Sequence, residues 1–270
     1  MSLIHPSASV HPSARIHPSV FIGPAAVIGE DVEIGEGSSV GAHAVVEFAA
    51  LGRNNKLHPG CYVGTAPQDI KYAGERTRLV MGDDNTVREC VTLNRGTSAH
   101  GETRIGNGCL FMAYSHVAHD CRIGNGVILV NSVAVAGHVE IDDFTVVGGL
   151  AAIHQYLRIG KYCMLGGGSM LNKDVPPFCT CQGYPAVLRG LNAVGLRRGG
   201  FSREAIASIK KTYKTVFLSG LVLEDALAVA RRETPAPEAA QMLDFIAQSK
   251  RGVMRPSPKG AREDQSEAVL

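Results

Sequence analysis

The chain has 270 residues, 31 of them glycine and none of them tryptophan, with a formal net charge of +2. This length allows one large domain, alone or with a small one. The near-neutral charge carries no nucleic-acid-binding signature, and without a basic-plus-apolar start or a long apolar run we expect neither a signal peptide nor a membrane span. Seven cysteines without a CxxC pair indicate reduced thiols in a cytoplasmic protein.

A period of six residues organises the first two thirds of the chain. From Ile4 to Val46 every sixth position is apolar, and we call each such position a slot. The next slot, Leu51, comes after five residues instead of six. From Leu51 the interval of six then continues to Leu171. Neither a helix nor an alternating strand has this period. A hexapeptide repeat indicates a parallel β-helix, here the left-handed type with three hexapeptides in each triangular coil. Twelve consecutive slots are filled: Ile105, Phe111, Val117, Ile123, Leu129, Val135, Ile141, Val147, Ile153, Ile159, Leu165 and Leu171.

Two segments interrupt the pattern without shifting its phase. Asp69 and Glu75 fall on interior slots, where an unpaired carboxylate would cost on the order of several kcal/mol. We therefore predict that residues 65–78 form a loop outside the helix, and that residues 95–104 form a second one. Loops on a rigid scaffold are where binding residues gather.

The repeat ends near Asp174, and helical patterns follow. The first predicted helix, recognised by one apolar face, begins after Ser202. A second helix is expected over residues 221–232 and a third over residues 238–249. The predicted organisation is a β-helix over 1–188, a small C-terminal α-helical domain over 189–252, and a disordered tail over 253–270. We expect the helices to shield the last coil.

The ten histidines fall into separate groups. His5, His11 and His17 each precede proline and fall on successive hexapeptides, so they lie at three different corners and are interpreted as turn residues. His43 and His58 have no polar neighbours that single them out and are interpreted as surface residues.

The segment around Val117 is different, because it carries His116, His119 and Asp120 on one hexapeptide. Residues 18 apart stack on adjacent coils, about 4.8 Å apart. This spacing places His138 beside Asp120 and Gly137 beside His119, with His154 one coil beyond Ala136. A histidine next to an aspartate is a candidate general base, and a glycine opposite it leaves room for a substrate and a free backbone N–H.

Three other interpretations of this cluster stay open on spacing alone. The histidines could form a solvated polar face. They could bind zinc, as in the trimeric hexapeptide carbonic anhydrases, where neutral imidazoles are the ligands. The chain could also be a non-catalytic scaffold, although the His119–Asp120 cluster would then have no purpose.

Over nearly its whole length the chain resembles the UDP-N-acetylglucosamine acyltransferase family of lipid A biosynthesis. The QDxKYxGE loop together with HxxHDC is the most specific part of the resemblance. The matching segments are Gln68-Asp69-Ile70-Lys71-Tyr72-Ala73-Gly74-Glu75, His116-Val117-Ala118-His119-Asp120-Cys121, Ala136-Gly137-His138-Val139, His154-Gln155, Asp174-Val175-Pro176-Pro177, and Arg197-Arg198 ahead of Gly200-Phe201-Ser202-Arg203-Glu204.

The resemblance implies a homotrimer with active sites between neighbouring β-helices. It implies transfer of an (R)-3-hydroxyacyl group from acyl carrier protein to the glucosamine 3-position of UDP-N-acetylglucosamine, with no metal or other cofactor. An acceptor with a 3-amino group, which would give an amide, and a zinc-dependent lyase stay open as alternatives. The acidic carrier needs a basic docking surface, for which the candidates are Arg197, Arg198, Arg203, Lys210 and Lys211.

The resemblance also implies roles for individual residues. His119 matches the catalytic base, Asp120 its orienting partner, and Gly137 the residue whose N–H stabilises the oxyanion. Gly167 matches the position that limits acyl-chain length, and Val194 stands where the family often has glutamate. The implied substrate contacts are Gln68, Asp69, Lys71, His116, His138, His154 and Gln155, with Asn192 and Arg198 on the nucleotide.

Overall fold

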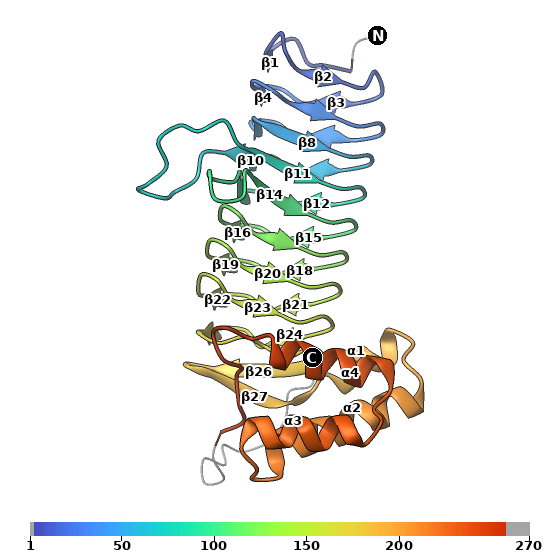
Figure 1. The fold of residues 1–270 in the computed structure, drawn as a ribbon. Coiled ribbons are helices and arrows are strands. Elements are labelled where there is room, and N and C mark those ends of the chain that lie inside the picture. The colour runs from blue at the N-terminus through green and yellow to red at the C-terminus, as the bar shows by residue number, and fades with distance from the viewer. Residues whose placement is uncertain (1–2, 258–270) are drawn as a thin grey trace.

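The computed structural model describes residues 3–257, and a left-handed parallel β-helix forms most of it, as the hexapeptide period predicted (Figure 1). Three parallel sheets form the sides of a triangular prism. The first sheet contains β1 (Ser9–Val10), β4 (Val27–Ile28), β7 (Val45–Val46), β10 (Tyr62–Thr65), β13 (Thr92–Asn94), β16 (His116–Val117), β19 (Ala134–Val135), β22 (Ala152–Ile153) and β25 (Met170–Leu171). The second contains β2 (Arg15–Ile16), β5 (Glu33–Ile34), β8 (Ala49–Leu51), β11 (Arg78–Met81), β14 (Glu102–Ile105), β17 (Arg122–Ile123), β20 (Glu140–Ile141) and β23 (Arg158–Ile159). The third contains β3 (Phe21–Ile22), β6 (Ser39–Val40), β9 (Lys56–Leu57), β12 (Thr86–Val87), β15 (Leu110–Phe111), β18 (Ile128–Leu129), β21 (Val146–Val147), β24 (Met164–Leu165), β26 (Cys179–Gly183) and β27 (Ala186–Leu191).

The register between coils follows the apolar period. Val117 pairs with Val135, 18 residues on, and both side chains are buried in the core. Ile34 instead pairs with Leu51, 17 residues on, so the residue missing from the period is missing from one corner. The continuous apolar interior holds the coils in register, because a slip of one residue would turn every interior side chain outward.

The sheets meet at three edges, which we name by their residues. The histidine edge, between the first and second sheets, comprises residues 118–121, 136–139 and 154–157. The helix edge, between the second and third sheets, comprises residues 142–145 and 160–163. The glycine edge, between the third and first sheets, comprises residues 148–151 and 166–169.

Both interruptions of the period are loops. Residues 66–77 leave the helix between β10 and β11 and project from its side (Figure 1). The second loop covers residues 95–101 and is shorter than predicted. Glu102 to Arg104 already belong to β14, because they pair with Arg78 to Val80 at the end of the first loop.

The C-terminal part closes the last coil. The antiparallel hairpin of β26 and β27, which the sequence did not reveal, extends the third sheet. Four helices follow before residue 258, where the described part of the chain ends: α1 (Ala193–Arg198), α2 (Arg203–Leu218), α3 (Leu223–Arg232) and α4 (Pro237–Ala247). Ser202 caps α2 by accepting a hydrogen bond from the N–H of Ala205, and Pro237 begins α4. No helix within residues 3–257 is long and apolar enough to cross a membrane.

The disordered tail predicted over 253–270 is wrong for its first residues. Val253 and Met254 are buried, Val253 bridges to Asp174, and Pro256 bridges to Leu188. Two apolar side chains and a neighbouring strand suffice to hold this segment on the last coil. Residues 258–270 of that prediction lie outside the described residues.

Candidate active site

Three corner residues stack on one another along the histidine edge. Asp120, His138 and Tyr156 follow one another at intervals of 18 and all have left-handed backbone conformations, with φ of 59°, 61° and 63°. Such a φ is unfavourable for residues other than glycine, asparagine and aspartate. The coil geometry imposes it here, and the side chains of neighbouring coils consequently stack along one line. The predicted placement of His138 beside Asp120 is confirmed.

The Asp120 carboxylate is buried and orients His119. Its side chain is 0% exposed, and its Oδ2 lies 2.8 Å from Nδ1 of His119. Thr97 donates to both oxygens, from its N–H at 3.0 Å and from its hydroxyl at 2.7 Å. Burial raises the pKa of Asp120, but the hydrogen bonds from Thr97 and His119 outweigh it and hold the pKa below its usual value. Since a carboxylate only accepts, Nδ1 of His119 donates to it and Nε2 is left free to take a proton.

Gly137 lies against the His119 ring, close to Cε1 and Nε2. A β-carbon at this position would lie 2.6 Å from Cε1 and 2.7 Å from Nε2 of the ring. The Gly137 N–H has no hydrogen-bond acceptor among residues 3–257. Nε2 of His119 and an unpaired backbone donor therefore lie side by side.

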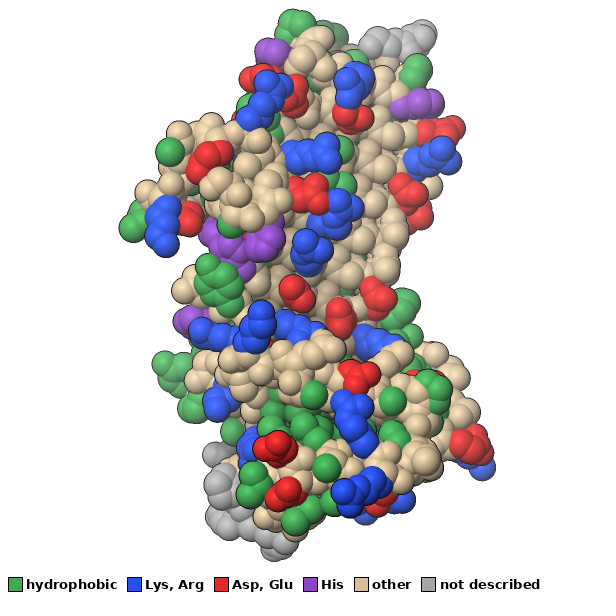
Figure 2. Space-filling model, in the orientation of Figure 1, with side chains coloured by type: hydrophobic (Ala, Val, Ile, Leu, Met, Phe, Trp, Pro, Cys, Tyr) green, Lys and Arg blue, Asp and Glu red, His purple; other side chains and the backbone are tan. Residues whose placement is uncertain are grey.

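His138 is a half-buried imidazole without a hydrogen-bond partner in the described part of the chain. Its ring stacks on Tyr156 with centroids 4.4 Å apart and meets the edge of His119 at 5.0 Å. Its Nδ1 is buried and unpaired, and Nε2 lies 3.8 Å from Asp120. Burial lowers the pKa of His138, which favours the neutral ring. Figure 2 shows the resulting group of histidines in purple beneath the projecting loop.

The first loop brings Asp69 to this group. Its Oδ2 lies 3.9 Å from Nε2 of His119, on the side away from Asp120. A turn holds it there: the N–H of Lys71 donates to the Asp69 carboxylate at 3.0 Å, and the N–H of Tyr72 to the Asp69 carbonyl at 3.0 Å. Gln68 and Lys71 are exposed on the same turn.

Other predicted site residues lie on the neighbouring surfaces. His116 points outward from the first sheet, where its Nδ1 lies 2.7 Å from the Thr92 hydroxyl and burial lowers its pKa. His154 and Gln155 are exposed one coil beyond Gly137. Nδ1 of His154 lies 3.3 Å from the Arg251 guanidinium.

Three of the predicted site residues lie away from His119 in a single chain: Asn192, Arg198 and Gly167. Asn192 caps α1 and donates to the Tyr162 carbonyl at 2.9 Å, which fixes it on the helix edge. Arg198 ends the same helix and is exposed. Gly167 lies on the glycine edge. The residues that the resemblance unites are thus distributed over all three edges.

Two residues of the second loop contact the site and were missed by the sequence reasoning. Thr97 fixes Asp120, and Nδ1 of His100 lies 3.7 Å from Asp120 Oδ1. Neither falls in a repeat slot, so the 18-residue arithmetic could not place them. Ligand atoms of His100, Asp120 and His138 lie within 4.8 Å of one another and could hold a metal ion. This set differs from the three-histidine site considered from the sequence, and both Asp120 oxygens already accept hydrogen bonds.

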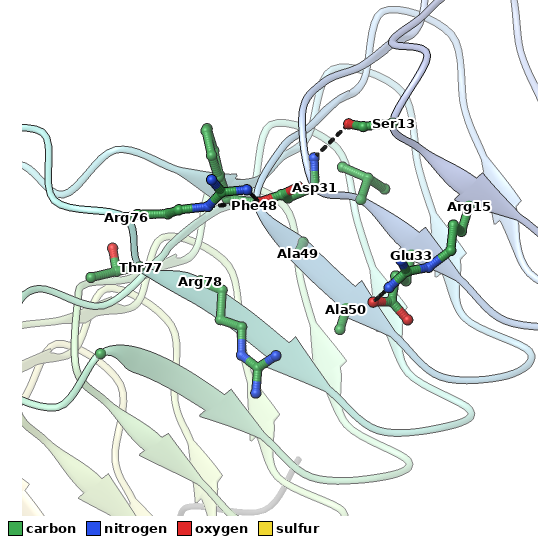
Figure 3. Close-up of a pocket in the computed structure, with 12 residues that line it drawn as sticks. Ser13, Arg15, Asp31, Glu33, Phe48, Ala49, Ala50, Arg76, Thr77 and Arg78 are labelled. Atoms are coloured by element: carbon green, nitrogen blue, oxygen red, sulfur yellow. Dashed lines mark hydrogen bonds and ion pairs between the residues drawn. The ribbon is translucent and has the colours of Figure 1, made fainter.

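An open cavity of about 410 Å³ lies on the second sheet, near the base of the first loop (Figure 3). Four of its charged lining residues pair with one another: Arg76 binds Asp31, and Arg15 binds Glu33. None of its lining residues belongs to the histidine group. The cavity therefore marks where the loop meets the β-helix and does not contain His119 or Asp120.

Known proteins resemble the chain in sequence and in structure. The profile of the family described as Udp N-acetylglucosamine O-acyltransferase, domain 2, matches residues 174–254, and a bacterial transferase hexapeptide profile matches 102–137. The acyl-[acyl-carrier-protein]–UDP-N-acetylglucosamine O-acyltransferase of Chlorobaculum parvum is 58% identical over 76% of this chain and 78% of its own, and that of Halorhodospira halophila is 49% identical over 76% and 80%. The solved UDP-N-acetylglucosamine acyltransferase of Bacteroides fragilis superposes with a TM-score of 0.91 at 40% identity, over 93% of this chain and 100% of its own. The chain belongs to the family of the acyl-[acyl-carrier-protein]–UDP-N-acetylglucosamine O-acyltransferases.

Proposed function

We propose that the protein transfers a 3-hydroxyacyl group from the thioester of acyl carrier protein to the 3-hydroxyl of UDP-N-acetylglucosamine, the first acylation of lipid A biosynthesis. The observation that carries this proposal is the arrangement of three groups: a buried Asp120 carboxylate, the His119 ring bound to it, and the free N–H of Gly137 beside that ring. Family membership supplies the substrates.

His119 acts as the general base. A sugar hydroxyl is a weak nucleophile at neutral pH and needs a base within hydrogen-bond reach. Nε2 of His119 takes the hydroxyl proton as the oxygen attacks the thioester carbon, and Asp120 stabilises the imidazolium that forms. Because Asp120 is held ionised by Thr97 and His119, this stabilisation is present before the substrate arrives.

The Gly137 N–H stabilises the oxyanion of the tetrahedral intermediate. One fixed donor of this kind contributes about 2.7–4 kcal/mol to the transition state. Collapse of the intermediate breaks the C–S bond, and the imidazolium returns its proton to the departing thiolate. The products are the sugar ester and the free thiol of the carrier. No redox step or added cofactor is needed.

The nucleotide contacts are assigned to cationic and polar side chains. Lys71 and Arg198 are exposed and suited to phosphate, and Asn192 is fixed at the start of α1. Val194 is 52% exposed where the family often has glutamate, so that contact to the nucleotide-sugar is absent here. The remaining parts of the acceptor and the acyl group would be contacted by five further residues: Gln68, His116, His138, His154 and Gln155.

A homotrimer would complete the site. The outer face of the second sheet is charged, with Glu140 between Arg122 and Arg158. The outer faces of the other two sheets are largely apolar or small: Leu110, Ile128, Val146 and Met164 on the third, and His116, Ala134, Ala152 and Met170 on the first.

Because these two faces are largely apolar, we expect the third sheet of one protomer to pack on the first sheet of the next, which closes a ring of three. In that arrangement the helix edge of one protomer adjoins the histidine edge of its neighbour. Asn192 and Arg198 then come to His119 from the neighbouring chain, and the glycine edges meet near the threefold axis. The cytosol is the proposed compartment, in keeping with seven free cysteines, six of them buried.

An acyl-transfer assay with carrier-protein thioesters and two acceptors tests the proposal. The expected product is an ester on UDP-N-acetylglucosamine. If product forms only from the 3-amino analogue, the enzyme makes an amide and the proposed ester product is wrong. Activity that a chelator abolishes and zinc restores would overturn the metal-free mechanism.

A further inference from the structure

We propose that Arg95 is a positioning residue, a buried clamp that holds the substrate loop (residues 66–77) in place for the acyl transfer proposed above. The proposal rests on that function for its kinetic part. Its structural part can be tested without any turnover.

Arg95 is an unusually enclosed charge for a thin solenoid. It opens the second loop, its side chain is 10% exposed, and its guanidinium lies 4.5 Å from the ring centre of Phe48. A buried charge is tolerated only when its hydrogen bonds are satisfied. Nη1 donates to the Gly64 carbonyl at 2.9 Å and to the Glu47 carboxylate at 3.2 Å.

The remaining donors of Arg95 reach into the substrate loop. Nε and Nη2 both donate to the Tyr72 hydroxyl, at 3.1 and 3.0 Å. That hydroxyl in turn donates to the Glu75 carbonyl at 2.8 Å. A single phenol oxygen thereby ties the middle and the end of the loop to a charge anchored in the β-helix.

Gly64 makes this anchorage possible. It lies at the bulge between Val63 and Thr65 with φ of 76°. A β-carbon there would collide with the Glu47 carbonyl. Only glycine allows the strand to come this close to Glu47 while its carbonyl accepts from Arg95.

The clamp connects directly to the reactive histidine. Tyr72 closes the turn that begins at Asp69, through its N–H at 3.0 Å. Asp69 is the loop residue whose carboxylate lies 3.9 Å from Nε2 of His119. No residue between Gln68 and Arg76 is buried, and Ile70 at the tip of the loop is fully exposed. Its own burial therefore cannot fix Asp69 and Lys71, and the Arg95–Tyr72 contact does.

Two variants test the clamp, with a matched control. Arg95→Met removes the guanidinium and keeps the length of the side chain. Tyr72→Phe removes only the hydroxyl and keeps the ring. Arg158→Met is the control, because Arg158 also lies 4.5 Å from a phenylalanine ring, that of Phe245, far from the loop.

Limited trypsinolysis of the folded protein reports on the loop, which contains Lys71 and Arg76. We expect cleavage after Lys71 to be about tenfold faster in both clamp variants, the factor that corresponds to one lost hydrogen bond to a charged group, and unchanged in Arg158→Met. Unchanged cleavage in Tyr72→Phe would overturn the clamp. If Arg95→Met fails to fold, Tyr72→Phe still decides.

Kinetics separate positioning from a purely structural role. We expect both clamp variants to raise the KM for the nucleotide-sugar about tenfold, with a smaller change in kcat, and Arg95→Lys to recover part of the loss. A lower Tm with unchanged KM and cleavage would make Arg95 a structural residue only and overturn the proposal. If the wild type itself transfers no acyl group, the proposed function fails, while the cleavage rates still test the clamp.

Discussion

Gly137 and His119 lie so close that a β-carbon on Gly137 would come within 2.6 Å of the imidazole ring. The backbone of Gly137 is not in the left-handed region, so alanine would be allowed by conformation and excluded only by the ring. The glycine is thus required by its neighbour on the next coil. This relationship joins the proposed base and the proposed oxyanion donor into one unit.

Gly137→Ala is expected to lower kcat on the order of 10²-fold, because a ring displaced by less than 1 Å loses its alignment with the hydroxyl. The fold should persist, since only the end of one side chain has to move. Steady-state kinetics with a thermal melt measures both. An alanine variant with wild-type kcat would show that the ring is not fixed in the working enzyme.

His119→Ala is expected to lower kcat about 10²–10⁴-fold, the usual contribution of a general base. The side chain is 13% exposed and its loss removes no core residue, so the Tm should change little. Kinetics at saturating substrate tests the assignment, and near-normal turnover would refute it.

The stability of the protein should fall as the pH drops through the histidine range. Burial lowers the pKa of His116 and of His138 below the usual 6.5. Below pH 6.5 the unfolded chain therefore binds more protons than the folded one, and stability is present above that pH and lost as the pH falls toward the folded pKa values.

Thermal melts between pH 7.5 and pH 5 measure this loss. His116→Asn keeps a polar side chain opposite Thr92 but removes one titrating group, so its Tm should depend less steeply on pH. A wild-type Tm that rises on acidification would contradict the burial argument.

Val146→Glu is expected to prevent assembly of the proposed trimer and to abolish activity. Val146 lies between Ile128 and Met164 on the apolar outer face of the third sheet, and a carboxylate buried there without a partner would cost about several kcal/mol at each interface. Val80→Glu is the matched control, since Val80 pairs with Arg104 on the charged second sheet. Light scattering should give a monomer for the first variant and a trimer for the second. A fully active monomer would disprove the shared site.

The sequence predicted the β-helix and the His119–Asp120–Gly137 group because both depend on a fixed interval of 18 residues. It also located the substrate loop, since Asp69 on an interior slot could not be accommodated. Thr97, His100 and Arg95 were not identified, because loop residues are placed by contacts between segments and not by a period. The hairpin of β26 and β27 was missed for the same reason.

The last prediction concerns acyl-chain length. Gly149 and Gly167 stack on adjacent coils of the glycine edge, as their spacing of 18 predicted: a β-carbon on Gly167 would lie 3.2 Å from the Gly149 carbonyl oxygen. Gly167 is exposed, so a longer side chain can point away from the backbone. Each buried methylene contributes about 0.8 kcal/mol, so four extra carbons in an open groove favour the long donor by roughly 3 kcal/mol at most.

Gly167→Met is therefore expected to shift preference toward donors shorter by several carbons, and Gly167→Ala to shift it less. The measurement is kcat/KM across hydroxyacyl donors of ten to sixteen carbons, for the wild type and both variants. The wild type should prefer a long chain, near fourteen carbons, because no side chain closes the groove at this position. If the three length profiles coincide, the glycines serve only to turn the corner, and another surface of the protein limits the length of the acyl chain.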